Sequence, residues 1–287
     1  MKKILLATTL LAASTGFAAA EVTLSGDARM GILSDFADDV QFTSRARVKF
    51  TLSGETDGGL AFGASFRADN AGAASSGDAG SVFVSGAFGK LSMGDVDGAA
   101  NAAVGHVSGV GLTGLGDLNE STFVGNGDGV TDPSALYEYS TGDLTIYASA
   151  TNPVDAAVAD AYSLAAKYAL GDYTVALGYE TVDGAVDIDH IILGASATFG
   201  AVTVKANYGQ AEVGAVDGDQ FAISVDYKAD ALTVTAFYAD DEELGGVEAY
   251  GLGASYDLGG GASLVGGYVQ NETADADSFD FGVSMSF

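Results

Sequence analysis

The segment QFTSRARVKFTL, residues 41–52, decides the fold, because apolar and polar side chains alternate along it. One face carries Phe42, Ala46, Val48, Phe50 and Leu52, and the other Gln41, Thr43, Arg45, Arg47, Lys49 and Thr51. Successive side chains of a β-strand point to opposite faces, so this period of two predicts a strand with one apolar and one polar face. A soluble sheet could carry the same pattern, so the rest of the chain has to decide between a soluble and a membrane sheet.

The alternation continues to the C-terminus, and its main interruption lies between Gly98 and Pro133. Five strands are expected before this interruption and eleven after it, about sixteen in all. Short turns at one end of the strands and longer connections at the other are typical of membrane β-barrels, whereas a β-sandwich would not sort its connections so consistently. The expected short turns are Gly142-Asp143, Gly171-Asp172, Gly200-Ala201, Ala229-Asp230 and Gly259–Gly261, and the expected longer acidic connections are Asn152–Asp160, Val182–Asp189, Glu212–Asp219, Asp240–Gly246 and Glu272–Asp277.

Composition excludes several classes of protein. The chain has 39 acidic and 11 basic residues, a formal net charge of −28 and no cysteine. Neutralising phosphates requires a basic face, so we expect no nucleic-acid partner. Disordered acidic chains combine charge with low hydrophobicity, whereas 48% of these residues are hydrophobic. The absence of cysteine excludes disulfides and thiolate sites.

The N-terminus, MKKILLATTLLAASTGFAAAE, has a positive start, an apolar centre and a small-residue cleavage site. We therefore predict a secretory signal peptide over residues 1–20 and a single β-barrel over residues 21–287. No run approaches the ~18 consecutive apolar residues of a membrane helix. A closed barrel is the other structure that satisfies every backbone group inside a bilayer, so we predict an all-β fold, a transmembrane antiparallel β-barrel of about sixteen strands around a water-filled lumen. Aromatic residues at strand ends fit interfacial belts: Tyr168, Tyr173, Tyr179, Phe199, Tyr208, Tyr227, Tyr238 and Tyr256.

The stretch from Gly98 to Pro133 is rich in glycine and asparagine and contains no lysine or arginine. A connection this long in a compact domain is usually functional, so we expect it to fold into the lumen and narrow it. A charge on the lipid face would cost ~2–4 kcal/mol, so the polar face of the first three strands must line the lumen. The basic patch on that face comprises Arg29, Arg45, Arg47, Lys49 and Arg67.

Acidic residues on or beside the long loop are expected to face this basic patch. A positive wall against an acidic loop would create a transverse field, and patches of charge are a standard source of pore selectivity. Because the whole chain is acidic, we expect the pore to prefer cations despite the basic patch. The candidate acids are Asp95, Asp97, Asp117, Glu120, Asp128 and Asp132.

Three alternatives follow from other features. A lipase-like barrel enzyme would need a histidine near a nucleophilic serine, for which His106 and Ser108 are the candidates, but no third orienting group is evident. An acidic glycine-rich adhesin or β-solenoid would show a fixed short repeat, whereas these units vary in length. Carboxylate runs such as Asp240–Glu243 and Asp275–Asp280 could hold calcium, although no EF-hand pattern is present, so any metal ligands are left unassigned.

The segments EVTLSGDARMG, SRARVKFTLSGETDGGLAFGASF, SGAFGKLSMGD and YGLGASYDLGGGASLVGGY resemble strands of the general porins of Gram-negative outer membranes, of the alphaproteobacterial type. The resemblance covers residues 21–287. It implies a trimeric sixteen-stranded barrel, the third external loop inside the lumen, and passive diffusion of small hydrophilic solutes and ions without catalysis. It also implies contact with outer-membrane lipid and lipopolysaccharide, and makes the terminal Phe287 a signal for the outer-membrane assembly machinery. Arg29, Arg45, Arg47 and Arg67 occupy strand positions that match the family's arginine wall.

Overall fold

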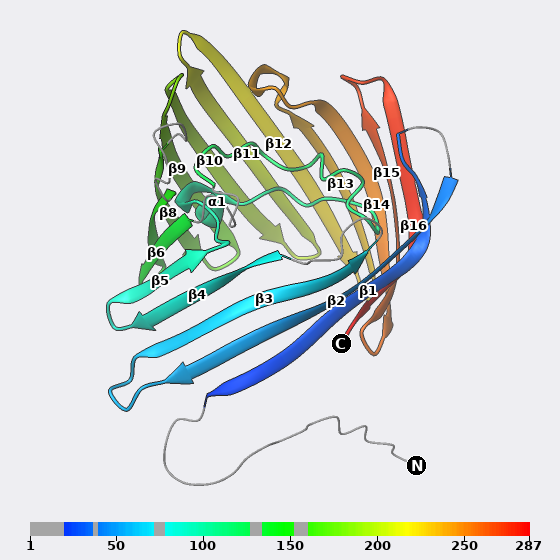
Figure 1. Cartoon of the computed structure of the whole chain (residues 1–287). Coiled ribbons are helices and arrows are strands. Elements are labelled where there is room, and N and C mark those ends of the chain that lie inside the picture. Colours follow the sequence, from blue (N-terminus) through cyan, green and yellow to red (C-terminus); the bar gives the residue numbers. More distant parts are fainter. Residues whose placement is uncertain (1–19, 37–39, 72–77, 127–133, 152–159) are drawn as a thin grey trace, which may run out of the picture.

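The computed structural model describes residues 20–36, 40–71, 78–126, 134–151 and 160–287. Within these ranges sixteen antiparallel strands form a closed barrel, each paired with its neighbours in sequence, and β1 pairs with β16 (Figure 1). The predicted fold and strand count are confirmed. The strands are β1 (Glu21–Ser34), β2 (Val40–Glu55), β3 (Ala61–Ala71), β4 (Asp78–Gly86), β5 (Gly89–Gly94), β6 (Ser134–Thr141), β7 (Leu144–Thr151), β8 (Asp160–Leu170), β9 (Tyr173–Asp183), β10 (Ile188–Phe199), β11 (Val202–Val213), β12 (Val216–Ala229), β13 (Leu232–Asp240), β14 (Glu248–Gly259), β15 (Ala262–Asn271) and β16 (Ala276–Ser286).

The described residues also include two short helices: α1 (Ala99–Val104) and the 3-10 helix η1 (Glu242–Leu244). Of the helices in the described ranges, none is long and apolar enough to cross a membrane. The helix α1 lies within the long connection expected over residues 98–133, for which the sequence predicts no helix. It ends at Gly105, whose φ of 67° is a conformation that glycine adopts without steric cost.

The seam of the barrel lies between β1 and β16 and is finished by the last residue of the chain. The Phe287 N–H donates to the Gly26 carbonyl at 2.9 Å, and the Gly26 N–H donates to the Phe287 carbonyl at 3.2 Å. Because every strand then has two neighbours, the described sheet has no open edge, which is the condition for a sheet inside a bilayer.

The two faces of the strands differ as the alternation predicted. On β10, His190 and Ile192 are buried against the interior, whereas Ile191 and Leu193 are exposed on the outside. On β2, Lys49 and Thr51 line a cavity in the lumen, whereas Phe42 is 94% exposed. The exposed apolar side chains form the surface that the hydrocarbon of the bilayer covers.

This register makes a direct prediction for thiol labelling. The chain contains no cysteine, so single replacements have no background. Lys49→Cys should react with a charged, water-soluble thiol reagent, because the side chain at position 49 faces the aqueous lumen. The neighbouring Val48→Cys should be protected in membranes, because Val48 faces outward. Equal labelling of the two variants in intact membranes would refute the register.

The short turns that follow β6, β8, β10 and β12 lie at one end of the barrel, and glycine begins most of them. Gly142, Gly171 and Gly200 each begin a two-residue turn with φ between 60° and 62°, the conformation that hairpins of this length require. The turn expected at Ala229-Asp230 lies one residue later, with Asp230 at φ 52°. Aspartate tolerates this region better than most residues, which explains how a hairpin forms there without glycine.

The prediction of one long connection is wrong. The stretch Glu212–Asp219 was predicted to be an acidic loop, but β11 runs to Val213 and β12 starts at Val216, so only Gly214 and Ala215 join them. Carboxylates are tolerated in these strands because they lie at the loop end, where Asp219 accepts a hydrogen bond from the Tyr208 hydroxyl at 3.1 Å.

The pairing of a tyrosine with a carboxylate recurs around this rim. Tyr179 donates to Asp189 at 2.5 Å on the adjacent strand, and Tyr238 donates to Glu248 at 2.9 Å. An aromatic ring with a hydrogen-bonded polar end suits the boundary between hydrocarbon and water. The aromatic residues expected at strand ends therefore form bands, with Tyr168, Tyr173, Phe199, Tyr227 and Tyr256 beside the short turns.

Candidate functional site: the lumen and its loop

The segment of residues 95–126, which follows β5, enters the barrel and lies along the inner wall (Figure 1). Its first part, α1, packs on β7, β8, β9 and β10. Serine hydroxyls on two of these strands accept the first backbone N–H groups of the helix: Ser149 from Ala99 at 2.8 Å and Ser163 from Ala100 at 2.9 Å. The wall thus satisfies helix donors that have no partner within the helix.

Glycines on the lumen face of the wall let the loop approach closely. A Cβ on Gly178 would lie 2.5 Å from the Ala100 side chain, and one on Gly267 would lie 2.6 Å from the Gly111 backbone. Both distances are shorter than real Cβ contacts allow. Any side chain at these two positions would therefore push the loop toward the centre of the lumen.

The tip of the loop is held by one carboxylate and by a small apolar core. Asp280 on β16 accepts hydrogen bonds from the Leu112 N–H at 2.8 Å, the Thr113 N–H at 2.6 Å and the Thr113 hydroxyl at 2.8 Å. Val107, Val110 and Leu115 of the loop are buried together with wall residues that include Phe237 and Val269. The loop therefore has a hydrophobic core inside a water-filled barrel.

The returning arm of the loop is held by a buried polar chain. Glu180, fully buried, accepts the backbone N–H groups of Val124 and Gly125, each at 3.0 Å, and lies 2.8 Å from His190 Nδ1. Gln220 lies 2.9 Å from His190 Nε2 and accepts the Thr122 N–H at 2.8 Å. A carboxylate with this many donors is satisfied in spite of its burial.

The residues of the basic patch lie on β1, β2 and β3, and arginines of the patch form ion pairs with carboxylates of the same wall. Arg45 pairs with Asp27 at 2.8 Å, while Asp69 binds both Arg47 at 3.0 Å and Arg67 at 2.6 Å. These carboxylates belong to β1 and β3, so the wall provides counter-charges that had been expected from the loop. The pairing of β2 with β3 would have identified one of these carboxylates as a partner of the arginines, because Asp69 lies directly opposite Arg47.

Between this wall and the base of the loop lies a cavity of about 710 Å³. Lys49 and Lys90 line it from the wall, and Asp95 and Asp97 line it from the segment that precedes α1. Glu138 on β6 also lines it and pairs with Lys90 at 3.0 Å. Both signs of charge thus face the same aqueous space.

Two of the other predicted acids, Asp117 and Glu120, do not line this cavity. Asp117 is on the loop tip, within electrostatic reach of Arg29, whose guanidinium also donates to the Leu112 carbonyl at 3.3 Å. Glu120 lies 3.8 Å from His106 Nε2. Asp128 and Asp132 fall outside the described residues.

The candidate residues for a barrel enzyme have other partners. The Ser108 hydroxyl donates to Asp226 at 2.7 Å, and His106 Nδ1 accepts the Ser121 N–H at 3.1 Å. In the described part of the chain no three histidine, aspartate or glutamate side chains come together so as to hold a metal ion.

The chain is similar to known proteins along nearly its whole length. A family model described as Gram-negative porin matches residues 7–276. A porin of Rhodobacter capsulatus is 41% identical over 302 residues, covering 93% of this chain and all of the relative, and a porin of Fuscovulum blasticum is 30% identical over 291 residues with the same coverage.

Solved structures agree with these relatives. A refined porin structure is 39% identical with a TM-score of 0.81, and an engineered porin of Rh. blastica is 25% identical with a TM-score of 0.76. Each comparison covers 93% of this chain and the whole of the other. The closed sixteen-stranded barrel, the loop inside it and these similarities lead to one conclusion: the chain belongs to the Gram-negative porin family and forms a channel in the outer membrane.

Proposed function

We propose that the channel is a cation-preferring diffusion pore whose constriction lies between the basic wall and the base of the loop. The observation that carries this proposal is the cavity of about 710 Å³, in which Lys49 and Lys90 oppose Asp95 and Asp97. Charges of opposite sign across a narrow aqueous gap create a field that orients polar solutes and disfavours apolar ones. Small hydrophilic solutes and ions are therefore the expected cargo.

The preference for cations follows from charge balance. Asp27 and Asp69 already balance two of the four positive charges of the wall arginines. The rim carries carboxylates such as Asp189, Asp219 and Glu248, and an excess of negative charge at a mouth concentrates cations there. Catalysis is not required for any of these roles.

The test is to replace Arg45 and Arg47 with serine. Arg67 still binds Asp69 through two nitrogen atoms, whereas Asp27 loses its ion pair with Arg45. The lumen therefore gains net negative charge. The cation-to-anion permeability ratio, measured from reversal potentials in a potassium chloride gradient, should rise roughly threefold. Lys228→Ser, which removes an exposed cation near the short turns, should change this ratio much less. A fall in the ratio after the double replacement would refute the proposal.

Three further expectations stay proposals. A homotrimer and lipopolysaccharide contacts fit the family, and the mass of the detergent-solubilised protein would test the trimer. Calcium at the acidic loops can be tested by calcium titration of the purified protein. Phe287 is 80% exposed with its backbone in the seam, and its role as an assembly signal can be tested by the outer-membrane yield of a chain that lacks it.

A further inference from the structure

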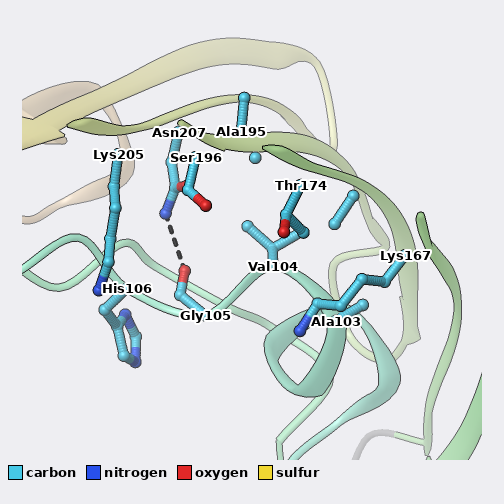
Figure 2. A pocket seen from close by; sticks show the side chains of 12 residues that line it. Ala103, Val104, Gly105, His106, Lys167, Thr174, Ala195, Ser196, Lys205 and Asn207 are labelled. Atoms are coloured by element: carbon cyan, nitrogen blue, oxygen red, sulfur yellow. Dashed lines mark hydrogen bonds between the residues drawn. The ribbon is translucent and has the colours of Figure 1, made fainter. Parts of the chain in front are cut away.

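A second recess lies on the other side of the loop, between α1 with the residues that follow it and strands β8 to β11. Its volume is about 370 Å³, within the range of small-molecule sites. Figure 2 shows Lys167 and Lys205 entering it from opposite sides, with the hydroxyl groups of Ser196 and Thr174 between them.

The charge of this recess is opposite to that of the chain. Among the described residues that line it there are two lysines and no carboxylate, although acidic residues outnumber basic ones more than threefold in the sequence. Glu120 lies 3.8 Å from His106 at the edge but does not line the recess. Glu138, whose charge reaches Lys167, is already paired with Lys90 at 3.0 Å.

The two lysines also lack the ion pairs that the wall arginines have. Within the described part of the chain, the Lys205 side chain has no hydrogen-bond or ion-pair partner, and the Lys167 side chain makes one long hydrogen bond, to the Ala102 carbonyl at 3.4 Å. The hydroxyls of Ser196 and Thr174 likewise make no side-chain hydrogen bond to another described residue. Two positive charges and two hydroxyl donors therefore face one space without a protein acceptor.

The shape of the recess is fixed before any ligand enters. Asn207 donates one amide hydrogen to the Gly105 carbonyl at 2.8 Å and the other to the Ser121 hydroxyl at 3.0 Å, which holds the loop side in place (Figure 2). A site whose wall is already ordered loses less conformational freedom on binding. Lys167 and Thr174 flank the turn at Gly171, and Ser196 and Lys205 flank the turn at Gly200, so the recess lies toward the short-turn end of the barrel.

We propose that this recess is an anion subsite, in which Lys167 and Lys205 hold a small oxyanion such as inorganic phosphate or the phosphate group of a small solute. Lysine binds phosphate as a point charge, and the Ser196 and Thr174 hydroxyls supply directional donors. The subsite would allow an otherwise acidic pore to retain anionic solutes on the short-turn side of the loop. The inference rests on the barrel being an open channel and not on the cation preference proposed above.

The experiment is phosphate binding to the purified, folded protein in detergent at low ionic strength, followed by phosphorus NMR. The wild-type protein should bind phosphate saturably, and sulfate and a dicarboxylate should compete, with their relative strength separating tetrahedral from planar oxyanions. Lys205→Gln should weaken binding roughly 3- to 10-fold, and the double variant Lys167→Gln/Lys205→Gln more strongly. Because the Lys205 side chain makes no hydrogen bond or ion pair with another described residue, its replacement by glutamine removes no such interaction from the fold.

Lys228→Gln is the matched control, because it removes one lysine at the same end of the barrel but outside the recess. It should leave phosphate binding within roughly twofold of the wild type. Equal weakening by Lys228→Gln, or no saturable binding by the wild type, would overturn the inference. Single-channel conductance of the same preparations in potassium chloride reports separately whether the pore is open, so failure of the subsite and failure of the channel give different results.

Discussion

Deleting Ala99–Asn126 is expected to yield a closed barrel with a larger single-channel conductance, by roughly twofold, and with weaker discrimination by solute size. None of the strand ladders includes a residue of this segment, and β5 and β6 are direct neighbours, so the remaining connection can join them. The wall groups that the loop now covers, such as Glu180 and Asp280, would become hydrated and need no new partner. The cavity beside Lys49 would merge with the rest of the lumen.

The deletion has a cost that must be measured alongside conductance. Without the loop, Phe237 and Val269 become exposed to water, which lowers the free energy of unfolding by about 1–3 kcal/mol for each side chain. The variant should therefore unfold at a lower temperature than the wild type but remain folded in detergent. The heat-dependent shift of its electrophoretic mobility reports the intact barrel. If conductance and size cut-off are unchanged in a folded variant, the loop does not define the pore.

Replacing Asp280 with alanine is expected to release the loop tip from the barrel wall. The change leaves two buried or half-buried N–H donors of the loop tip without an acceptor, at about 1–3 kcal/mol each. The tip should then detach from β16 while the barrel stays closed. Hydrogen exchange of the Leu112, Thr113 and Leu115 amides should become much faster, and single-channel recordings should become noisier.

A matched variant separates the anchor from the charge. Glu138→Gln also removes one carboxylate from the lumen, but Glu138 forms its ion pair with Lys90 on β5 and not with a residue of the loop. Its loop amides should exchange at the wild-type rate. Identical exchange in Asp280→Ala and wild-type protein would mean that the apolar contacts of Val110 and Leu115 are sufficient to hold the tip.

The barrel could be read from the sequence because its pattern is local. An alternation with a period of two shows directly which side chains share a face of a strand. Gly142, Gly171 and Gly200 mark the turns, because other residues adopt their positive φ values with difficulty. The error at Glu212–Asp219 has a simple cause. A run of acids looks like a loop, but a strand that extends beyond the bilayer has no reason to avoid charge.

The anchors of the loop could not be read in the same way. Glu180 and Asp280 each occupy an ordinary polar position in an alternating strand, and nothing nearby in sequence indicates that they lie beneath backbone N–H groups far along the chain. The glycines at 178 and 267 give an equally weak signal in a chain with 41 glycines. Their role depends on tertiary proximity, which a single sequence does not contain.

The long-range bonds of the loop also set an order of events during assembly. Apart from the seam between β1 and β16, the strand pairs of the barrel join neighbours in sequence, whereas the loop tip bonds to a residue 168 positions away, on the last strand to be made. Contacts of such separation form late, because chain closure must precede them. Each newly inserted molecule should therefore pass through a stage in which its neighbouring strands are paired and its interior is still wide, before the narrow passage forms.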